Sequence, residues 1–345
     1  MRILSRTCVF LCLMSCAVPA AAQTAEFGGW SPFGPVPVDQ AGAGRRGYSL
    51  PGESADVTGP QANLVSFHMV GANNFFIEDS GAINISQRSE AHTLAFEYRR
   101  GFKKSGWPRF EIGAQIQVTE SDSGMMNGFI SGFEDLVRAP LRSVKATPPL
   151  GMSLVRNGRT MYTASGEGAG LGDIYIVAKA ALRDAPATSR AARIAARVAV
   201  NLSGAADFTL GNYIGVGLSL DKKLTERIAF HGDVRSSLTL DAVSTWGLPL
   251  RRTAVGFSVG PELRVADNTS LNLQIDGSSS PYQPVGSIAL DSGYGDAVLG
   301  VNHRFTRGQR QLVTQFYLRE NMVLPFNVRW NADPDFAIGF KISIH

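Results

Sequence analysis

The side chains best suited to metal or thiol chemistry are few in this sequence. The 345 residues contain three cysteines, at positions 8, 12 and 16, and five histidines. Zinc sites and thiol nucleophiles depend on such ligands at fixed spacings, for example in a His-Glu-x-x-His pair, and no such pair occurs. The sequence therefore predicts no metal, no cofactor and no catalytic residue. The histidines are His68, His92, His231, His303 and His345.

Three further patterns could support chemistry, and the sequence favours a structural interpretation of each. The run from Gly166 to Gly172 resembles a phosphate-binding loop, but such loops open a helix, and this run precedes a segment that predicts a strand. His231 and Asp233 share one face of another predicted strand, where we expect a hydrogen bond. A lipid hydrolase would need a serine beside His92 or His303, and neither has an obvious partner.

From residue 61 onward the dominant pattern is an alternation of apolar and polar residues. Clear examples are Phe110 to Thr119, Arg193 to Leu202 and Phe336 to His345. A period of two places one kind of side chain on each face of a β-strand. After residue 22 no apolar run approaches the length of about 18 residues that a membrane-spanning helix needs. The apolar residues are thus dispersed over the faces of strands.

About twelve segments alternate in this way, each with the length of about 10 residues that suits a tilted transmembrane strand. They lie near residues 61–70, 91–100, 108–119, 171–182, 191–202, 212–221, 227–240, 252–265, 269–277, 296–306, 310–320 and 335–345. Short and long connections alternate between them, as in outer-membrane barrels, and two of the long ones are Gly71 to Glu90 and Glu120 to Gly170.

This pattern predicts an all-β fold, a transmembrane antiparallel β-barrel of about 12 strands, with 10 or 14 strands as alternatives. Both chain termini then lie on the periplasmic side. The competing fold is a water-soluble sandwich or lipocalin-like barrel. The charges on the polar face argue against that fold, because a wet lumen accommodates them better than an apolar core does.

The N-terminal 22 residues resemble an export signal. Arg2 and Arg6 precede an apolar stretch, and Ala20 to Ala22 provides a cleavage site; the alternative is a lipoprotein signal with acylated Cys16. Removing residues 1–22 takes Lys+Arg from 33 to 31 against 29 Asp+Glu, a net charge of +2. This balance gives no reason to expect nucleic acid as a partner.

An irregular Gly/Pro-rich periplasmic leader, residues 23–60, is expected between the signal and the barrel of residues 61–345. Its prolines fix φ and remove backbone donors, so it cannot form a central strand. Two placements are open. The leader is either a free periplasmic tail or a segment that Trp30 and Phe33 anchor inside or beneath the barrel.

The connection from Glu120 to Gly170 contains the one segment that predicts a helix, a short helix in a long external loop. An apolar stripe at helical spacing ends before Pro140. We hypothesise that this helix packs over or into the barrel mouth as a lid, and the alternative is a loop on the outer rim. The stripe consists of Phe129, Ile130, Phe133, Leu136 and Val137.

The same region carries a family resemblance. The runs Met126 to Phe133, Leu136 to Arg142 and Gly170 to Asp173 resemble the uncharacterised proteobacterial family filed as domain of unknown function 3187. The resemblance covers most of the chain after the signal, and it implies an outer-membrane β-barrel without an assigned activity. That family has an Asp and a Phe-His pair where this sequence has Asn127 and Phe133-Glu134.

The polar faces of the predicted strands give a candidate set of lumen-lining charges, in which nine cations face five anions. If the lumen is open, this excess favours anionic solutes. Alternatively, the charges pair across neighbouring strands and close a narrow barrel. The set is Glu97, Arg99, Glu111, Lys179, Arg193, Arg197, Asp233, Arg235, Glu262, Arg264, Asp276, Arg304, Arg319 and Lys341.

These expectations together describe an outer-membrane protein of a Gram-negative bacterium. The predicted function is a narrow channel or transporter for small solutes. A closed barrel that serves structure or interaction is the alternative, and an outer-membrane lipid-modifying enzyme is less favoured. The expected partners are outer-membrane lipid and lipopolysaccharide, and the barrel-assembly machinery, which would recognise the alternating C-terminal strand.

Overall fold

A computed structural model describes twelve stretches of the chain. They are residues 32–37, 50–79, 83–122, 151–164, 168–186, 189–204, 211–244, 247–286, 288–291, 293–308, 310–321 and 336–345.

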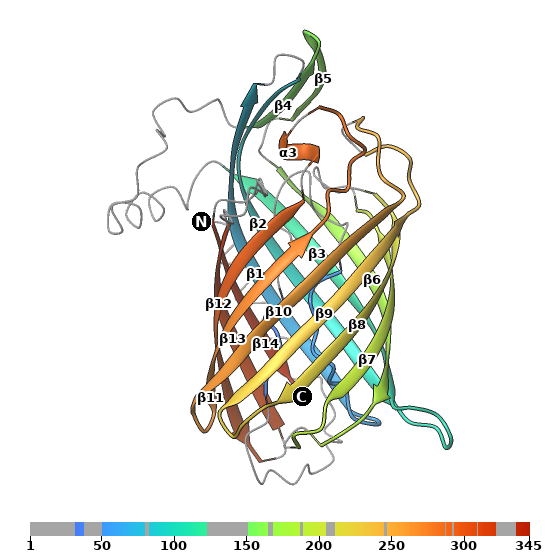
Figure 1. The fold of residues 1–345 in the computed structure, drawn as a ribbon, viewed down its shortest axis with the longest axis vertical. Coiled ribbons are helices and arrows are strands. Elements are labelled where there is room, and N and C mark those ends of the chain that lie inside the picture. Colours follow the sequence, from blue (N-terminus) through green and yellow to red (C-terminus); the bar gives the residue numbers. More distant parts are fainter. Residues whose placement is uncertain are drawn as a thin grey trace.

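Twelve antiparallel strands form a closed barrel (Figure 1), and the prediction of a twelve-stranded β-barrel is confirmed. Each strand pairs with its neighbours along the chain, and the first pairs with the last, from Val65 with Ile344 to Asn73 with Phe336. The strands are β1 (Asn63–Asp79), β2 (Ile83–Phe102), β3 (Phe110–Asp122), β6 (Gly168–Arg183), β7 (Arg193–Leu202), β8 (Tyr213–Lys223), β9 (Ile228–Thr239), β10 (Thr253–Ala266), β11 (Thr269–Ser278), β12 (Tyr294–Arg307), β13 (Arg310–Asn321) and β14 (Phe336–Ile344).

The long connection expected at Gly71 to Glu90 is wrong, because most of it is strand. β1 and β2 have 17 and 20 residues and remain paired as far as Asp79 with Asn84. Ile83 and Ile85 do alternate with polar residues, but the run is too short to distinguish a strand from a loop by sequence alone. The β1–β2 hairpin therefore extends beyond the neighbouring strands (Figure 1).

A second hairpin continues this extension. β4 (Gly151–Arg156) pairs with β2 and with β5 (Arg159–Ala164). The turn between them is Asn157-Gly158, with φ of 50° and 74°, and Asn-Gly is a strong sequence signal for a tight hairpin turn. The hairpin was not predicted, because the alternating pattern on either side of the turn is short.

The predicted lid helix and its stripe from Phe129 to Val137 lie outside the described residues. In the part of the chain that the structure describes, the one helix is α3 (Ile288–Asp291), in the connection between β11 and β12. No described helix is both long enough and apolar enough to cross a bilayer.

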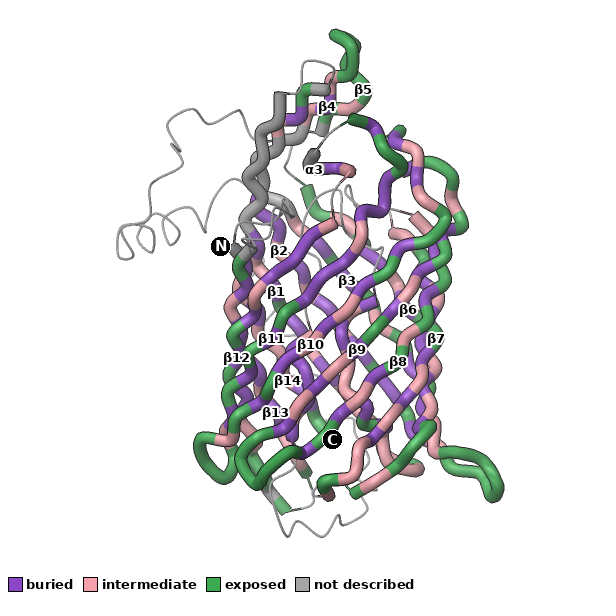
Figure 2. The backbone as a smooth tube through the Cα atoms, in the orientation of Figure 1, coloured by how far each residue is buried: buried purple, intermediate pink, exposed green. Residues whose placement is uncertain are grey.

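The two faces of the barrel differ sharply in polarity. Along β7 and β8, buried residues alternate with more accessible ones (Figure 2), and the buried positions include Arg193, Arg197 and Asp221. The accessible ones include Val198, Val216 and Leu218, which are 44%, 52% and 50% exposed. A water-soluble barrel would reverse this arrangement, so the alternative of a lipocalin-like core does not fit.

Tyr317 stabilises the seam, the pairing of β1 with β14 that closes the barrel. Its ring on β13 lies over Gly339 on β14, and its hydroxyl is 2.9 Å from Nε2 of His68 on β1. A Cβ on Gly339 would overlap the Tyr317 ring. Glycine is therefore needed here for a close approach, not for an unusual φ.

We expect Gly339→Ala to destabilise the barrel by about 2 kcal/mol, because the displaced Tyr317 ring loses both its packing and its bond to His68. The midpoint of urea unfolding in detergent micelles measures the change. Gly232→Ala on β9 is the matched control, since a Cβ there meets only Phe230, at 3.8 Å. Equal midpoints for the two variants would contradict this account of the seam.

Candidate functional site

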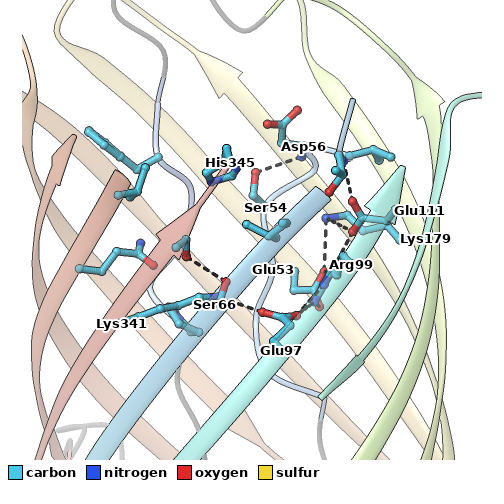
Figure 3. Close-up of a pocket in the computed structure, with 18 of the residues that line it drawn as sticks. Glu53, Ser54, Asp56, Ser66, Glu97, Arg99, Glu111, Lys179, Lys341 and His345 are labelled. Atoms are coloured by element: carbon cyan, nitrogen blue, oxygen red, sulfur yellow. Dashed lines mark hydrogen bonds and ion pairs between the residues drawn. The ribbon is translucent and has the colours of Figure 1, made fainter. Parts of the chain in front are cut away.

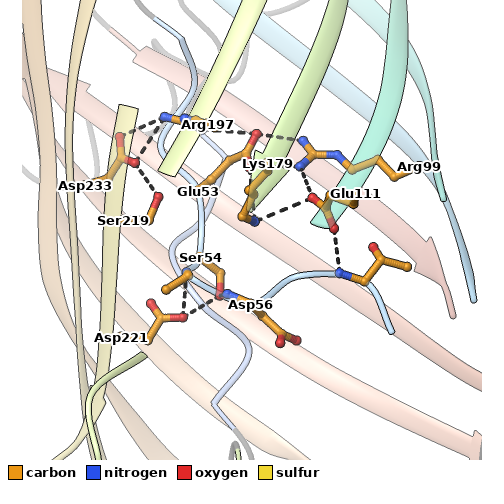
Figure 4. Close-up of polar contacts among 12 residues, drawn as sticks. Glu53, Ser54, Asp56, Arg99, Glu111, Lys179, Arg197, Ser219, Asp221 and Asp233 are labelled. Carbon is orange, nitrogen blue, oxygen red and sulfur yellow. Dashed lines mark hydrogen bonds and ion pairs between the residues drawn. The ribbon is translucent and has the colours of Figure 1, made fainter. Parts of the chain in front are cut away.

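The lumen of the barrel contains part of the protein's own leader. Figure 4 shows the leader passing inside the wall of strands. Backbone N–H groups of Phe33 and Gly34 donate to the Glu262 carboxylate at 3.0–3.2 Å, and Gln274 both accepts from and donates to the backbone of Val36. Because this Pro-rich segment cannot join the sheet, wall side chains satisfy its backbone groups instead.

This finding decides between the two placements of the leader for its described residues. Residues 32–37 and 50–58 contact the inner face of the wall, so the description as a free periplasmic tail does not hold for them. Of the two predicted anchors, Phe33 lies against the wall, with the Arg304 guanidinium 4.5 Å from its ring centroid. Trp30 lies outside the described residues.

Apolar contacts between leader and wall are small and separate. Leu50 packs with Tyr175 and Tyr213, and Val57 packs with Ala195. Val36 packs in a third cluster with Tyr317. None of these clusters is large enough to act as a core for the barrel, so the leader depends mainly on polar contacts.

The central polar contact is the carboxylate of Glu53, which three wall cations surround (Figure 4). Arg99 donates to both of its oxygens, from Nη1 to Oε2 at 2.9 Å and from Nη2 to Oε1 at 2.6 Å. Arg197 Nη1 lies 3.0 Å from Oε1, and Lys179 Nζ lies 3.3 Å from Oε2. The cations come from β2, β6 and β7.

Glycines opposite two of these cations leave room for their side chains. Arg197 on β7 crosses Gly217 of β8 to pair with Asp233 on β9 at 2.9 Å, and a Cβ on Gly217 would lie 2.5 Å from Arg197 Nε. Arg99 lies opposite Gly113 of β3, where a Cβ would lie 2.5 Å from its Cγ, and its partner Glu111 is on the same strand. The polar network thus reaches over whole strands.

Arg99 also binds carboxylates of the wall. Its Nε donates to Glu97 at 2.6 Å, and its Nη1 donates to Glu111 at 2.7 Å. Glu97 also pairs with Lys341 at 3.3 Å, and Glu111 accepts the backbone N–H of Thr58 at 2.5 Å. The wall carboxylates therefore bind both the wall cations and the leader.

A buried histidine joins two more leader contacts. His231 lies between two carboxylates, with Nδ1 2.7 Å from Asp221 and Nε2 2.8 Å from Glu262. Asp221 accepts the Ser54 hydroxyl at 2.6 Å and the Ala55 N–H at 2.8 Å. The expected partner of His231, Asp233, pairs instead with arginines, because the register of β9 brings residues 231 and 233 to different neighbours.

A third group of pairs lies around β9 to β13. Arg235 donates from Nη2 to both oxygens of Asp276 at 2.8 Å and from Nη1 to Asp233 at 3.3 Å. Arg319 pairs with Asp296 at 2.7 Å. All five side chains are 2% exposed or less, so their charges are compensated out of contact with bulk water.

The structure places most of the predicted lumen set inside the barrel, either paired with one another or facing the leader. The exception is Arg264, which is partly exposed and pairs with the exposed Asp267 at the β10–β11 turn. Those inside are Glu97, Arg99, Glu111, Lys179, Arg193, Arg197, Asp233, Arg235, Glu262, Asp276, Arg304, Arg319 and Lys341.

Several charged or titratable groups of the network were missing from the predicted lumen set. Asp221, His231 and Asp296 lie in the inward phase of their strands, so the alternation could have found them. Glu53 could not have been found in this way, because an irregular segment has no periodicity that shows where a side chain points.

A cavity of about 420 Å³ remains between the leader and the wall near the C-terminus (Figure 3). Glu97, Arg99, Lys341 and His345 are among the residues that line it. In the described part of the chain, no group of three His, Cys, Asp or Glu side chains is arranged to hold a metal ion. The cavity is therefore a part of the lumen that the described leader leaves open, and charged side chains line it.

The barrel resembles solved outer-membrane channels. A COG4313 outer-membrane channel from Pseudomonas putida F1 superimposes with a TM-score of 0.54 at 12% identity, over 84% of this chain and 98% of that one. A FadL homologue from Pseudomonas aeruginosa matches with a TM-score of 0.41 at 10% identity, over 92% and 98% of the two chains. The first likeness shows the fold.

No family model matches the sequence, and no curated protein matches it either. The resemblance to domain of unknown function 3187 stays a prediction.

Proposed function

We propose that this protein is an outer-membrane channel for small solutes and that its own leader is the gate. The observation that carries the proposal is the way in which the leader is held. Its described residues are held in the lumen by hydrogen bonds and ion pairs to wall side chains, and not by a large apolar core. Such contacts exchange with water at modest net cost, so a seated and a displaced leader can both be populated.

The outer face supports a place in the membrane. Large apolar side chains stand exposed along the strands, among them Ile112, Ile176, Leu273 and Leu299 at 48%, 49%, 56% and 51%. A contiguous apolar surface of this kind on a closed barrel suits lipid. Export through residues 1–22, contact with lipopolysaccharide and insertion by the barrel-assembly machinery through β14 belong to the same proposal.

One observation favours the alternative of a closed interaction barrel. Among the described residues, most lumen charges are paired within the wall or with the leader, and the cavity near the C-terminus has only about 420 Å³. A barrel whose leader never leaves would have this appearance too. The two functions therefore differ in one measurable property, which is whether the leader moves.

A disulfide between leader and wall tests the gate. A Cβ built on Gly52 lies 2.9 Å from the Cβ of Ser258 on β10, so a bond with the usual Cβ separation of about 3.8 Å needs a shift under about 1 Å. In Gly52→Cys/Ser258→Cys, with Cys8, Cys12 and Cys16 replaced by serine, oxidation is expected to lower KCl conductance in planar bilayers at least about tenfold. Reduction should restore it.

The two single-cysteine variants are the matched controls, and their conductance should not respond to oxidant. A protein that conducts equally with the disulfide closed and open would contradict the gate. A protein that conducts in neither state, nor after its leader is deleted, would be a closed barrel, and the proposal would fail.

A further inference from the structure

The seated leader presents one carboxylate, that of Glu53, to three cations of the wall. Each oxygen of Glu53 has two cationic nitrogens within reach, Oε1 from Arg99 and Arg197 and Oε2 from Arg99 and Lys179. The Glu53 side chain is only 14% exposed, and the three cations are 10% exposed or less. The wall therefore contains a built site for a planar group with two oxygens.

The shape of the site suits an anion with two oxygens, and Glu53 shows that a carboxylate fits it. Arg99 donates from Nη1 to one oxygen and from Nη2 to the other, which is the bidentate geometry of an arginine and a carboxylate. A halide ion is a single acceptor atom, so it cannot place one acceptor opposite each nitrogen of the fork. The preference thus comes from geometry as well as from charge.

The wall carboxylates connected to the site do not neutralise all of its cations without Glu53. The ion pairs that connect to the site link five wall cations with four wall carboxylates, so the described wall network has a net charge of +1 before Glu53 joins it. Glu53 brings the sum to zero. The cations are Arg99, Lys179, Arg197, Arg235 and Lys341, and the carboxylates are Glu97, Glu111, Asp233 and Asp276.

The neutralising group belongs to the leader, the segment that leaves when the channel opens. A displaced leader leaves these cations with their wall carboxylates but without Glu53, so the wall network keeps a net charge of +1 that attracts another anion. A solute carboxylate that enters the site therefore also favours the displaced leader, because it competes with Glu53 for the same nitrogens.

We infer that Arg99, Lys179 and Arg197 form a binding site for the carboxylate of a small organic acid, and that Glu53 is its internal substitute in the closed state. This inference rests on the proposed channel function and names its substrate class.

Removal of the Glu53 carboxylate followed by replacement with acetate tests the site. Acetate has the size of the part of the side chain that Glu53→Ala removes, and acetamide is its uncharged counterpart. In the refolded full chain in detergent, acetate should bind to Glu53→Ala at least tenfold more tightly than acetamide, as measured by calorimetry. Glu53→Gln is the matched control, because its amide fills the space and acetate should bind at least tenfold more weakly.

A second measurement leaves Glu53 in place. Ala55 is 3% exposed, so the thiol of Ala55→Cys, with Cys8, Cys12 and Cys16 replaced by serine, reports whether the leader is seated. Acetate should accelerate labelling of this thiol by a maleimide at least threefold, whereas acetamide and chloride at equal concentration should not.

Equal binding of acetate and acetamide to Glu53→Ala would overturn the inference, and so would acceleration by chloride as strong as by acetate. Neither result would touch the channel function, which stands on KCl conductance. If acetate binds selectively but no variant conducts, the site stands and its role in transport fails with the proposed function.

Discussion

Deletion of residues 23–60 is expected to convert a poorly conducting barrel into an open one, with a rise in single-channel conductance of at least about tenfold. The physical reason is the volume and the charge that the leader contributes to the lumen. Without it, Glu262, Gln274 and Asp221 no longer bind a second backbone inside the wall, and water can occupy its place. A twelve-stranded barrel encloses more space than its own side chains fill.

Deletion of residues 23–31 is the matched control for this experiment. It shortens the leader but keeps every described contact between leader and wall, so its conductance should equal that of the full chain. It also removes Trp30, and an increase in conductance with this shorter deletion would show that the predicted anchor holds the leader. If deletion of 23–60 leaves conductance unchanged in a folded barrel, the leader is not the barrier to ions.

The charge reversal Arg235→Glu is expected to prevent the barrel from reaching its folded state. Arg235 is 1% exposed at its side chain and neutralises Asp276 with two hydrogen bonds. The substitution places a third carboxylate beside Asp233 and Asp276 in a site with little access to water. Loss of one partner of a buried pair alone costs about 3–5 kcal/mol, and reversal adds repulsion to that loss.

Heat modifiability on gels measures the folded fraction, and Arg264→Glu is the control. Both arginines come from the same predicted lumen set, but Arg264 lies at a turn beside the exposed Asp267, where screening by water keeps ion pairs weak. We expect Arg264→Glu to fold as well as the unmodified chain. Equal folded fractions for the two reversals would contradict the role of the buried network in stability.

Much of the barrel could be predicted from the sequence, because lipid and lumen impose opposite polarity on alternate residues. The runs Phe110 to Thr119 and Arg193 to Leu202 lie within strands or match them almost to the residue. The β1–β2 hairpin beyond Gly71 was missed for a related reason. The alternating run there is too short to distinguish a strand from a loop by sequence alone.

The composition of the site was only partly predictable. The inward phase identifies Arg197 and Asp233, but their pairing depends on register and on Gly217 between them, which alternation does not encode. The position of Glu53 depends on a contact between an irregular leader and a distant wall. A contact of that kind follows from tertiary structure, and the local pattern around residues 50–60 does not contain it.

The leader also constrains the order in which the protein can assemble. Phe33 contacts Glu262, 229 residues further along the chain, so the leader cannot dock before β10 and β11 exist. Contacts of such long range form late, since the chain loses much entropy before they stabilise anything. The leader runs directly into β1, the strand whose pairing with β14 completes the cylinder. Closure of the seam and docking of the leader are therefore expected as neighbouring last steps, and a seated leader would mark a chain whose assembly is complete.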